Sequence, residues 1–142
     1  MSIATIDAPA TPGFRHDAIY RRVAKYLRNF VDEHSLGHVL THDTFVSYIR
    51  LSEYNVPYGS EEVTPELVAE VRSPTDRWTT VLKKVVKHLN LGVSAVLVFD
   101  PKTTSVIVYR LDDSPATFNA ADTLVIPDVL PGFAVPVDQL FE

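Results

Sequence analysis

Residues 65–78, PELVAEVRSPTDRW, decide the fold because they contain the end of a core strand and the start of a helix. The apolar, β-branched run from Leu67 to Arg72 predicts a strand. The SPTD sequence that follows offers Ser73 or Thr75 as an N-cap, so a helix is predicted over residues 75–90. Within the strand, Val68, Glu70 and Arg72 share one face. A carboxylate therefore stands in the middle of an otherwise apolar strand.

Glu70 has two interpretations on residue pattern alone. An ionised carboxylate inside a sheet needs a cation, a metal ion or several donors, because desolvating a lone charge costs on the order of several kcal/mol. One interpretation is structural, in which Glu70 pairs with Arg72 or a lysine, or lies at an exposed strand end. The other is functional, in which the carboxylate belongs to a metal site.

The residues after this stretch predict the centre of a sheet. The predicted helix carries an apolar stripe formed by Trp78, Val81, Leu82, Val85 and Leu89. Residues 93–99 are almost wholly apolar, as in a strand covered on both faces. A turn at 100–103 leads into residues 105–111 and makes a hairpin. The strand–helix–strand order predicts two parallel strands bridged by the helix at residues 75–90.

The N-terminal half predicts a long helix followed by strands. Apolar residues recur at helical spacing from Arg15 until the sequence HSLG at 34–37: Ile19, Tyr20, Val23, Leu27, Phe30 and Val31. The opposite face carries Arg21, Arg22, Lys25 and Arg28, which either follow nucleic-acid phosphates or form a solvated helix face. Residues 38–51 predict one or two strands. We expect residues 1–13 to form a flexible arm and 14–142 a single domain.

Composition favours a soluble, cytoplasmic protein. The chain has 142 residues, is 46% hydrophobic and contains no cysteine, which excludes disulfides and thiolate chemistry. No signal peptide or bilayer-spanning run is visible, so no membrane partner is expected. The net charge is −5, yet all 13 Lys and Arg residues precede position 111. An acidic C-terminal segment therefore follows a body that is locally basic.

One family shares these elements in this order. EVRSPTDRW, the helix followed by LGV, a strand and DP, then VYR and LPGF closely resemble the bacterial Uma-type restriction-endonuclease family, a branch of the PD-(D/E)XK nuclease superfamily. The resemblance runs from about Pro65 to Phe141. It implies an α/β fold with a restriction-endonuclease-like mixed β-sheet flanked by helices, and a Mg²⁺- or Mn²⁺-dependent endonuclease acting on DNA.

The resemblance also implies site residues. Glu70 matches the metal-binding glutamate, and Lys84 matches a lysine that has moved from the strand to the following helix, although a solvated lysine is the alternative. In one alignment His42-Asp43 replaces the family's Pro-Asp pair, which makes Asp43 the second metal ligand. In the other alignment the piece that holds the aspartate is missing, and Asp43 is a turn residue.

Two functions remain open at this stage. The first is the metal-dependent nuclease, with Glu70, Lys84 and Asp43 as catalytic residues. The second is a catalytically silent relative that binds nucleic acid or protein. Homodimer formation is expected by analogy with the family alone.

Overall fold

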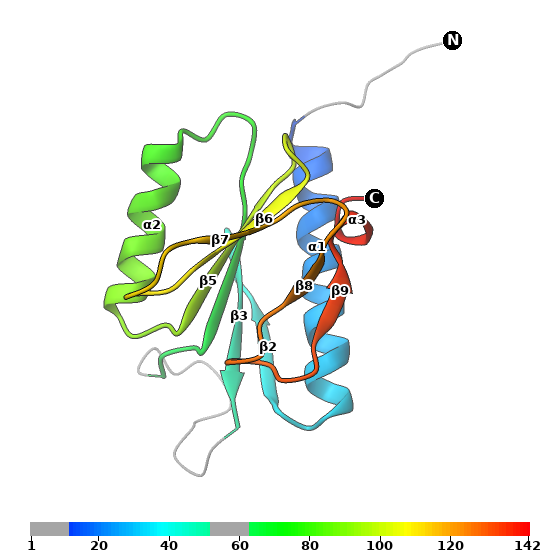
Figure 1. The fold of residues 1–142 in the computed structure, drawn as a ribbon, viewed down its shortest axis with the longest axis vertical. Coiled ribbons are helices and arrows are strands. Elements are labelled where there is room, and N and C mark those ends of the chain that lie inside the picture. The colour runs from blue at the N-terminus through cyan, green and yellow to red at the C-terminus, as the bar shows by residue number, and fades with distance from the viewer. Residues whose placement is uncertain (1–11, 52–62) are drawn as a thin grey trace.

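The computed structural model describes residues 12–51 and 63–142, and these form one mixed sheet between helices (Figure 1). The elements, in chain order, are α1 (Pro12–Glu33), β2 (Gly37–Thr41), β3 (Phe45–Arg50), β4 (Leu67–Val71), α2 (Trp78–Asn90), β5 (Ala95–Asp100), β6 (Ser105–Tyr109), β7 (Ala116–Phe118), β8 (Thr123–Val125), β9 (Ala134–Pro136) and α3 (Val137–Leu140). The fold class expected from the sequence is confirmed.

The main sheet has six strands in the order β2-β3-β4-β5-β6-β7, and β8 and β9 form a separate pair. Strands β4 and β5 are parallel, with Glu70 opposite Val98. The other neighbours in the main sheet are antiparallel, and Phe45 of β3 stands opposite Glu70. The predicted parallel pair bridged by a helix is therefore present, and it puts the carboxylate in the middle of the sheet.

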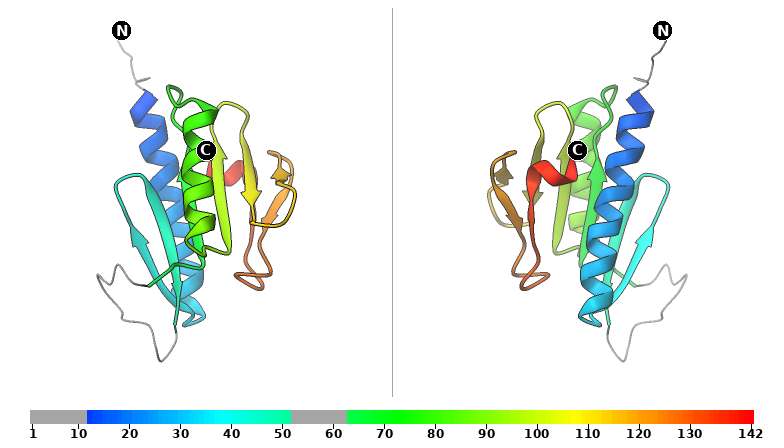
Figure 2. Two further views of the ribbon diagram at one scale, coloured as in Figure 1. Left: turned by 90° about the vertical axis from the view of Figure 1, so that its left-hand side faces the viewer. Right: turned by 90° about the vertical axis from the view of Figure 1, so that its right-hand side faces the viewer.

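The two faces of the sheet are covered differently (Figure 2). On one face, α1, α3 and the β8–β9 pair bury the larger core, which includes Leu27, Leu97 and Leu124. On the other face, α2 packs its apolar stripe against Val68, Val96 and Val98. The alternation of side chains along β4 places Glu70 on this second face, with α2 directly above it.

The start of α2 differs from the prediction. The helix begins at Trp78, with Arg77 at the N-cap position and no side-chain cap, so Ser73 and Thr75 were wrong as N-caps. Instead, the Ser73 N–H donates to Asp76 Oδ2 at 3.0 Å, and the Ser73 and Thr75 hydroxyls hydrogen-bond at 3.1 Å. These short polar residues hydrogen-bond one another within a tight loop before the helix. Ser, Thr and Asp form such loop hydrogen bonds as readily as N-cap hydrogen bonds, so the two uses of the same residue types compete.

The N-terminal boundaries can be compared with expectation only in part. Helix α1 begins at Pro12, so the last two residues of the expected arm belong to the helix. The rest of that arm, residues 1–11, lies outside the described residues, as do residues 52–62. In the part of the chain that the structure describes, no helix is both long and apolar enough to cross a membrane.

Candidate active site

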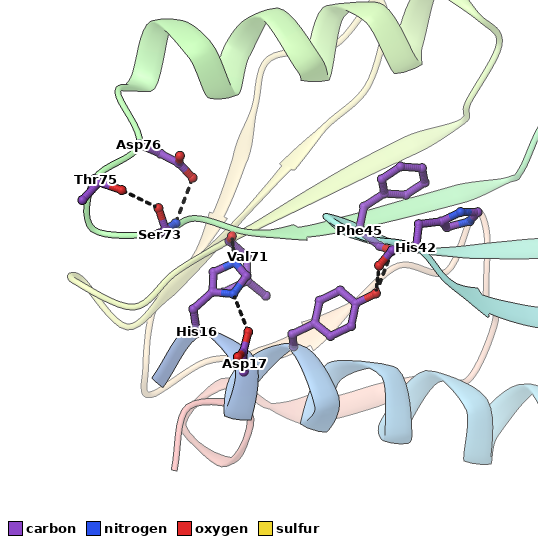
Figure 3. Close-up of polar contacts among 9 residues, drawn as sticks. His16, Asp17, His42, Phe45, Val71, Ser73, Thr75 and Asp76 are labelled. Carbon is purple, nitrogen blue, oxygen red and sulfur yellow. Dashed lines mark hydrogen bonds and ion pairs between the residues drawn. The ribbon is translucent and has the colours of Figure 1, made fainter. Parts of the chain in front are cut away.

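A pocket of about 190 Å³ lies where β4 ends, between the first turns of α1 and the start of α2. Its lining includes His16, Asp43, Glu70, Arg72, Asp76 and Lys84. Figure 3 shows this region, with His16 rising from α1 to Val71 and the Ser73–Asp76 loop leading to α2. The three residues that the family resemblance selected thus line one pocket, although they come from three separate elements.

Glu70 is buried beneath α2, with only 5% of the residue exposed. Two basic side chains of α2 face its carboxylate from successive turns. Lys84 Nζ lies 3.7 Å from Oε1, and His88 Nε2 lies 3.5 Å from Oε2. Oε2 is fully buried and has no hydrogen-bond partner. Lys84 and His88 therefore flank the carboxylate, but its oxygen Oε2 accepts no hydrogen bond.

The structural interpretation of Glu70 offered two cations, and the structure has the lysine, Lys84, rather than Arg72. The Arg72 guanidinium donates to Asp100 Oδ1 at 3.3 Å and to the Asp76 carbonyl at 3.1 Å. It also lies over the Trp78 ring, 4.8 Å from the centroid. Asp100 is itself buried, so this pair neutralises both charges and ties the loop before α2 to β5. The cation that remains beside Glu70 in the pocket is Lys84.

Asp43 lies in the turn between β2 and β3, and it also lines the pocket. It precedes Phe45, the cross-strand neighbour of Glu70, by two residues. The Tyr20 hydroxyl of α1 donates to the carbonyl of His42 and, at 3.0 Å, to that of Phe45. Hydrogen bonds on both sides of Asp43 therefore anchor its turn to the first helix.

Burial affects the groups around this turn. It raises the pKa of the Tyr20 phenol, and the negative charge of Asp43 adds to the effect. It lowers the pKa of His42, in the same direction as the nearby charge of His88. The His42 ring stacks on Phe45, with centroids 4.2 Å apart, and its Nε2 lies 3.0 Å from Ser47 Oγ. The turn that carries Asp43 is thus packed against the sheet.

Two histidines near the pocket were not selected as site residues from the sequence. His16 Nε2 lies 2.7 Å from the Val71 carbonyl, which joins the first turns of α1 to the end of β4. His88 approaches Glu70 from the closed side. A signal for His88 was present, because a residue four positions after Lys84 lies on the same helix face.

The basic stripe on α1 is divided in the structure. Arg21, Arg22 and Lys25 line a groove of about 450 Å³ between α1 and α3, together with Gln139 and Glu142. Arg28 instead donates to the Val39 carbonyl of β2 at 3.4 Å. Three of the four residues predicted to contact nucleic acid thus share one concave surface, and the fourth, Arg28, is directed toward strand β2.

The pocket lining includes three carboxylates, those of Asp43, Glu70 and Asp76, and the Lys84 ammonium group. Carboxylate oxygens are hard ligands suited to Mg²⁺ and Mn²⁺. Asp76 already accepts a hydrogen bond from the Ser73 N–H, and Glu70 Oε1 is the oxygen on the Lys84 side of its carboxylate. Within residues 12–51 and 63–142, no group of three or more His, Asp or Glu side chains is placed to hold a metal ion. A metal held here would therefore keep several of its water ligands, as Mg²⁺ usually does.

Comparisons with known proteins identify a family and a fold for this chain. The family model Uma2, described as "Putative restriction endonuclease", matches residues 5–138. A crystal structure described as a "putative nuclease belonging to DUF820" from Anabaena variabilis ATCC 29413 has the same fold. It superposes with a TM-score of 0.77 at 17% sequence identity, over 95% of this chain and 83% of that one. A comparison with curated proteins returned no match.

Proposed function

The chain belongs to the Uma2 family, and we propose that it is a Mg²⁺-dependent endonuclease that hydrolyses phosphodiester bonds of DNA. One observation carries this proposal. Asp43, Glu70 and Lys84 line a single pocket, although 27 residues separate the first two. Two acids and a lysine around one cavity are the residue types that metal-assisted phosphodiester hydrolysis requires.

Glu70 and Asp43 are the residues that would hold the metal ion. Both residues line the pocket and carry oxygen ligands, and Glu70 Oε1 lies on the Lys84 side of its carboxylate, so the donor set fits Mg²⁺ or Mn²⁺. The bound ion would supply Lewis acidity and lower the pKa of a water molecule. The position of Asp43 just ahead of the cross-strand partner of Glu70 favours the alignment in which His42-Asp43 replaces the Pro-Asp pair.

The remaining chemistry falls to the protein's own side chains. The Lys84 ammonium group, half-buried at the pocket, is placed to stabilise the negative charge that grows on the phosphate during the reaction. Because Arg72 is paired with Asp100, it does not compete with Lys84 for this role. The hydrogen bonds from Tyr20 keep the Asp43 turn in place, which preserves the geometry that the reaction needs.

The DNA backbone has a second contact in this proposal. The α1–α3 groove presents Arg21, Arg22 and Lys25, against one acidic residue, Glu142. Such a concentration of positive charge attracts phosphates regardless of base sequence. Arg28 is also exposed on α1, but it does not line this groove and its guanidinium donates to the Val39 carbonyl, so we leave it out of the contact.

A plasmid-nicking assay with Mg²⁺ or Mn²⁺ tests the proposal. Wild-type protein should convert supercoiled DNA to nicked and linear forms, and Glu70→Ala should not. Glu66→Ala is the matched control, because Glu66 lies just before β4 but pairs with Arg50 at 3.6 Å and does not line the pocket. The control should cleave at the wild-type rate. Equal cleavage by Glu70→Ala would contradict the proposed role of this carboxylate.

The second candidate function is a silent relative that binds nucleic acid without cleaving it. The observation that favours it is that, among the described residues, no group of three or more His, Asp or Glu side chains is placed to hold a metal ion. DNA binding in a gel-shift assay, together with no cleavage by the wild type at millimolar Mg²⁺ or Mn²⁺, would select this alternative.

A further inference from the structure

The two carboxylate oxygens of Glu70 have different surroundings. Oε1 faces Lys84 at the pocket, whereas Oε2 is fully buried and forms no hydrogen bond. The polar group opposite Oε2 is His88 Nε2, at 3.5 Å. His88 lies outside the pocket lining among the described residues, so it stands behind the carboxylate rather than beside a substrate.

The His88 ring is itself held in place. Its side chain is only 16% exposed, and its edge packs against Phe45 with the centroids 5.0 Å apart and the planes at 64°. Phe45 stands opposite Glu70 in the sheet and stacks on His42. A ring fixed on one side by an aromatic neighbour loses little further freedom when it contacts the carboxylate on the other side.

We propose that His88 is a positioning residue that orients the Glu70 carboxylate for metal binding. The terminal torsion of a glutamate has a broad, shallow energy profile, so an unsupported carboxylate rotates easily. The His88 imidazole, whose Nε2 lies 3.5 Å from Oε2, limits that rotation and keeps Oε1 toward the pocket. Groups that hydrogen-bond a ligating carboxylate from behind typically change metal affinity by about 10–100-fold. This inference rests on the proposed function, because it assumes that Glu70 is a metal ligand.

A purely structural role would have a different signature. If His88 only filled space beneath α2, its replacement would change the melting temperature and leave metal affinity alone. The informative variants are therefore His88→Leu, which keeps the bulk but removes the donor, and His88→Gln, which keeps an N–H at similar reach. Lys87→Ala is the control, because Lys87 is the preceding residue of α2 and is exposed.

The experiment is a calorimetric titration of each variant with Mn²⁺, accompanied by thermal melts. We expect Mn²⁺ affinity at least about 10-fold below wild type in His88→Leu, and within about 3-fold of wild type in His88→Gln and Lys87→Ala. If His88→Leu does not fold, His88→Met provides the second test, since it also removes the imidazole and keeps an apolar side chain of similar length. The same loss of affinity is expected there.

The outcomes separate this inference from the proposed function. Wild-type affinity in a folded His88→Leu protein, whatever its melting temperature, overturns the positioning role and leaves the nuclease proposal intact. An equal loss in His88→Leu and His88→Gln also overturns it, because the donor would then not be the property that matters. Absence of Mn²⁺ binding by the wild type removes the proposed function, and the inference fails with it.

Discussion

Two charged clusters in this molecule differ in how fully their carboxylates are hydrogen-bonded and in how exposed they are. Arg110, just after β6, meets Asp128 through two parallel hydrogen bonds, Nε to Oδ2 at 2.7 Å and a terminal nitrogen to Oδ1 at 2.8 Å. Glu70 meets Lys84 at 3.7 Å and His88 at 3.5 Å, with no hydrogen bond to Oε2. The side chain of Asp128 is 46% exposed, whereas that of Glu70 is 7% exposed.

The better-bonded cluster is thus the more exposed one. A protein that optimised stability alone would saturate a buried carboxylate first, since burial makes each missing hydrogen bond costly. The Arg110–Asp128 pair connects the residue that follows β6 to the segment between β8 and β9, and both carboxylate oxygens of Asp128 accept a hydrogen bond. Glu70 Oε2, by contrast, is buried and accepts no hydrogen bond.

The largest effect should come from Asp43→Asn. This change removes one of two negative charges available to a cation but keeps the shape of the turn. We expect Mn²⁺ affinity and plasmid cleavage to fall by at least about 100-fold, since even outer-shell changes at metal sites cost roughly 10–100-fold. Calorimetry and the nicking assay measure both quantities. Asp32→Asn, at an exposed position near the end of α1, is the control and should behave as wild type.

Asp128→Asn should have a smaller effect, on stability alone. We expect the free energy of unfolding at pH 7 to fall by about 0.5–1 kcal/mol, because bidentate geometry places this exposed pair at the upper end of the usual range. Chemical denaturation measures the difference. Unchanged cleavage activity would sharpen the contrast with the Glu70 cluster, and reduced activity would contradict it.

The same pair predicts a pH dependence. The hydrogen bonds from Arg110 hold the pKa of Asp128 below its ordinary value of 3.8. A depressed folded-state pKa adds stability above the unfolded-state pKa, and this contribution is lost as the pH falls through the folded-state value. The stability gap between wild type and Asp128→Asn should therefore be constant above about pH 5 and shrink below 3.8. Thermal melts of the wild type and Asp128→Asn at pH 7, 4 and 3 test whether the stability difference shrinks as the pH falls.

Arg21→Ala should produce a weaker effect, on DNA binding. One lost phosphate contact should reduce affinity by a few-fold at most. The negative slope of log affinity against log salt should become shallower by about 1. Fluorescence anisotropy with a duplex at several salt concentrations measures the slope. Lys83→Ala removes a charge from the exposed face of α2, outside the groove, and should leave the slope unchanged.

The smallest effect is expected for Glu70→Gln on stability. The change removes a buried charge that is incompletely bonded, and leaves Lys84, which is 41% exposed, free to turn to water. We expect the free energy of unfolding to change by less than about 1 kcal/mol. Cleavage should nevertheless be lost. A destabilisation of several kcal/mol would show that Glu70 is a structural ion pair, which contradicts the comparison drawn above.

The core of the fold was predictable because its signals are local. The apolar run before Asp100 and the helical stripe from Trp78 to Leu89 each specify one element, and their order specifies the parallel pair. Strand β9 was missed because three residues in an alternating pattern give too little periodicity to identify. The N-cap was misplaced because Ser and Thr stabilise loops and caps by the same hydrogen bonds.

The candidate site was predictable only in its acid and lysine. Helical geometry put Lys84 away from the apolar stripe, and the structure shows why this does not mean full exposure: the sheet surface beneath it is Glu70 rather than an aliphatic side chain. Whether Asp43 lies near Glu70 depends on the register of β3 against β4. The roles of Arg72 and His88 depend on contacts across 28 and 18 residues, which no local pattern encodes.

The parallel pairing of β4 with β5 has a consequence for synthesis on the ribosome. Antiparallel neighbours such as β2 and β3 can pair as soon as both have emerged, but a parallel pair must wait for the whole crossover that joins its strands. Helix α2 is that crossover, and the face on which it packs includes Val96 and Val98 of β5 as well as Val68 of β4. A nascent chain can therefore bring its two acids together before it acquires Lys84. The positive charge is the last part of the site to be assembled.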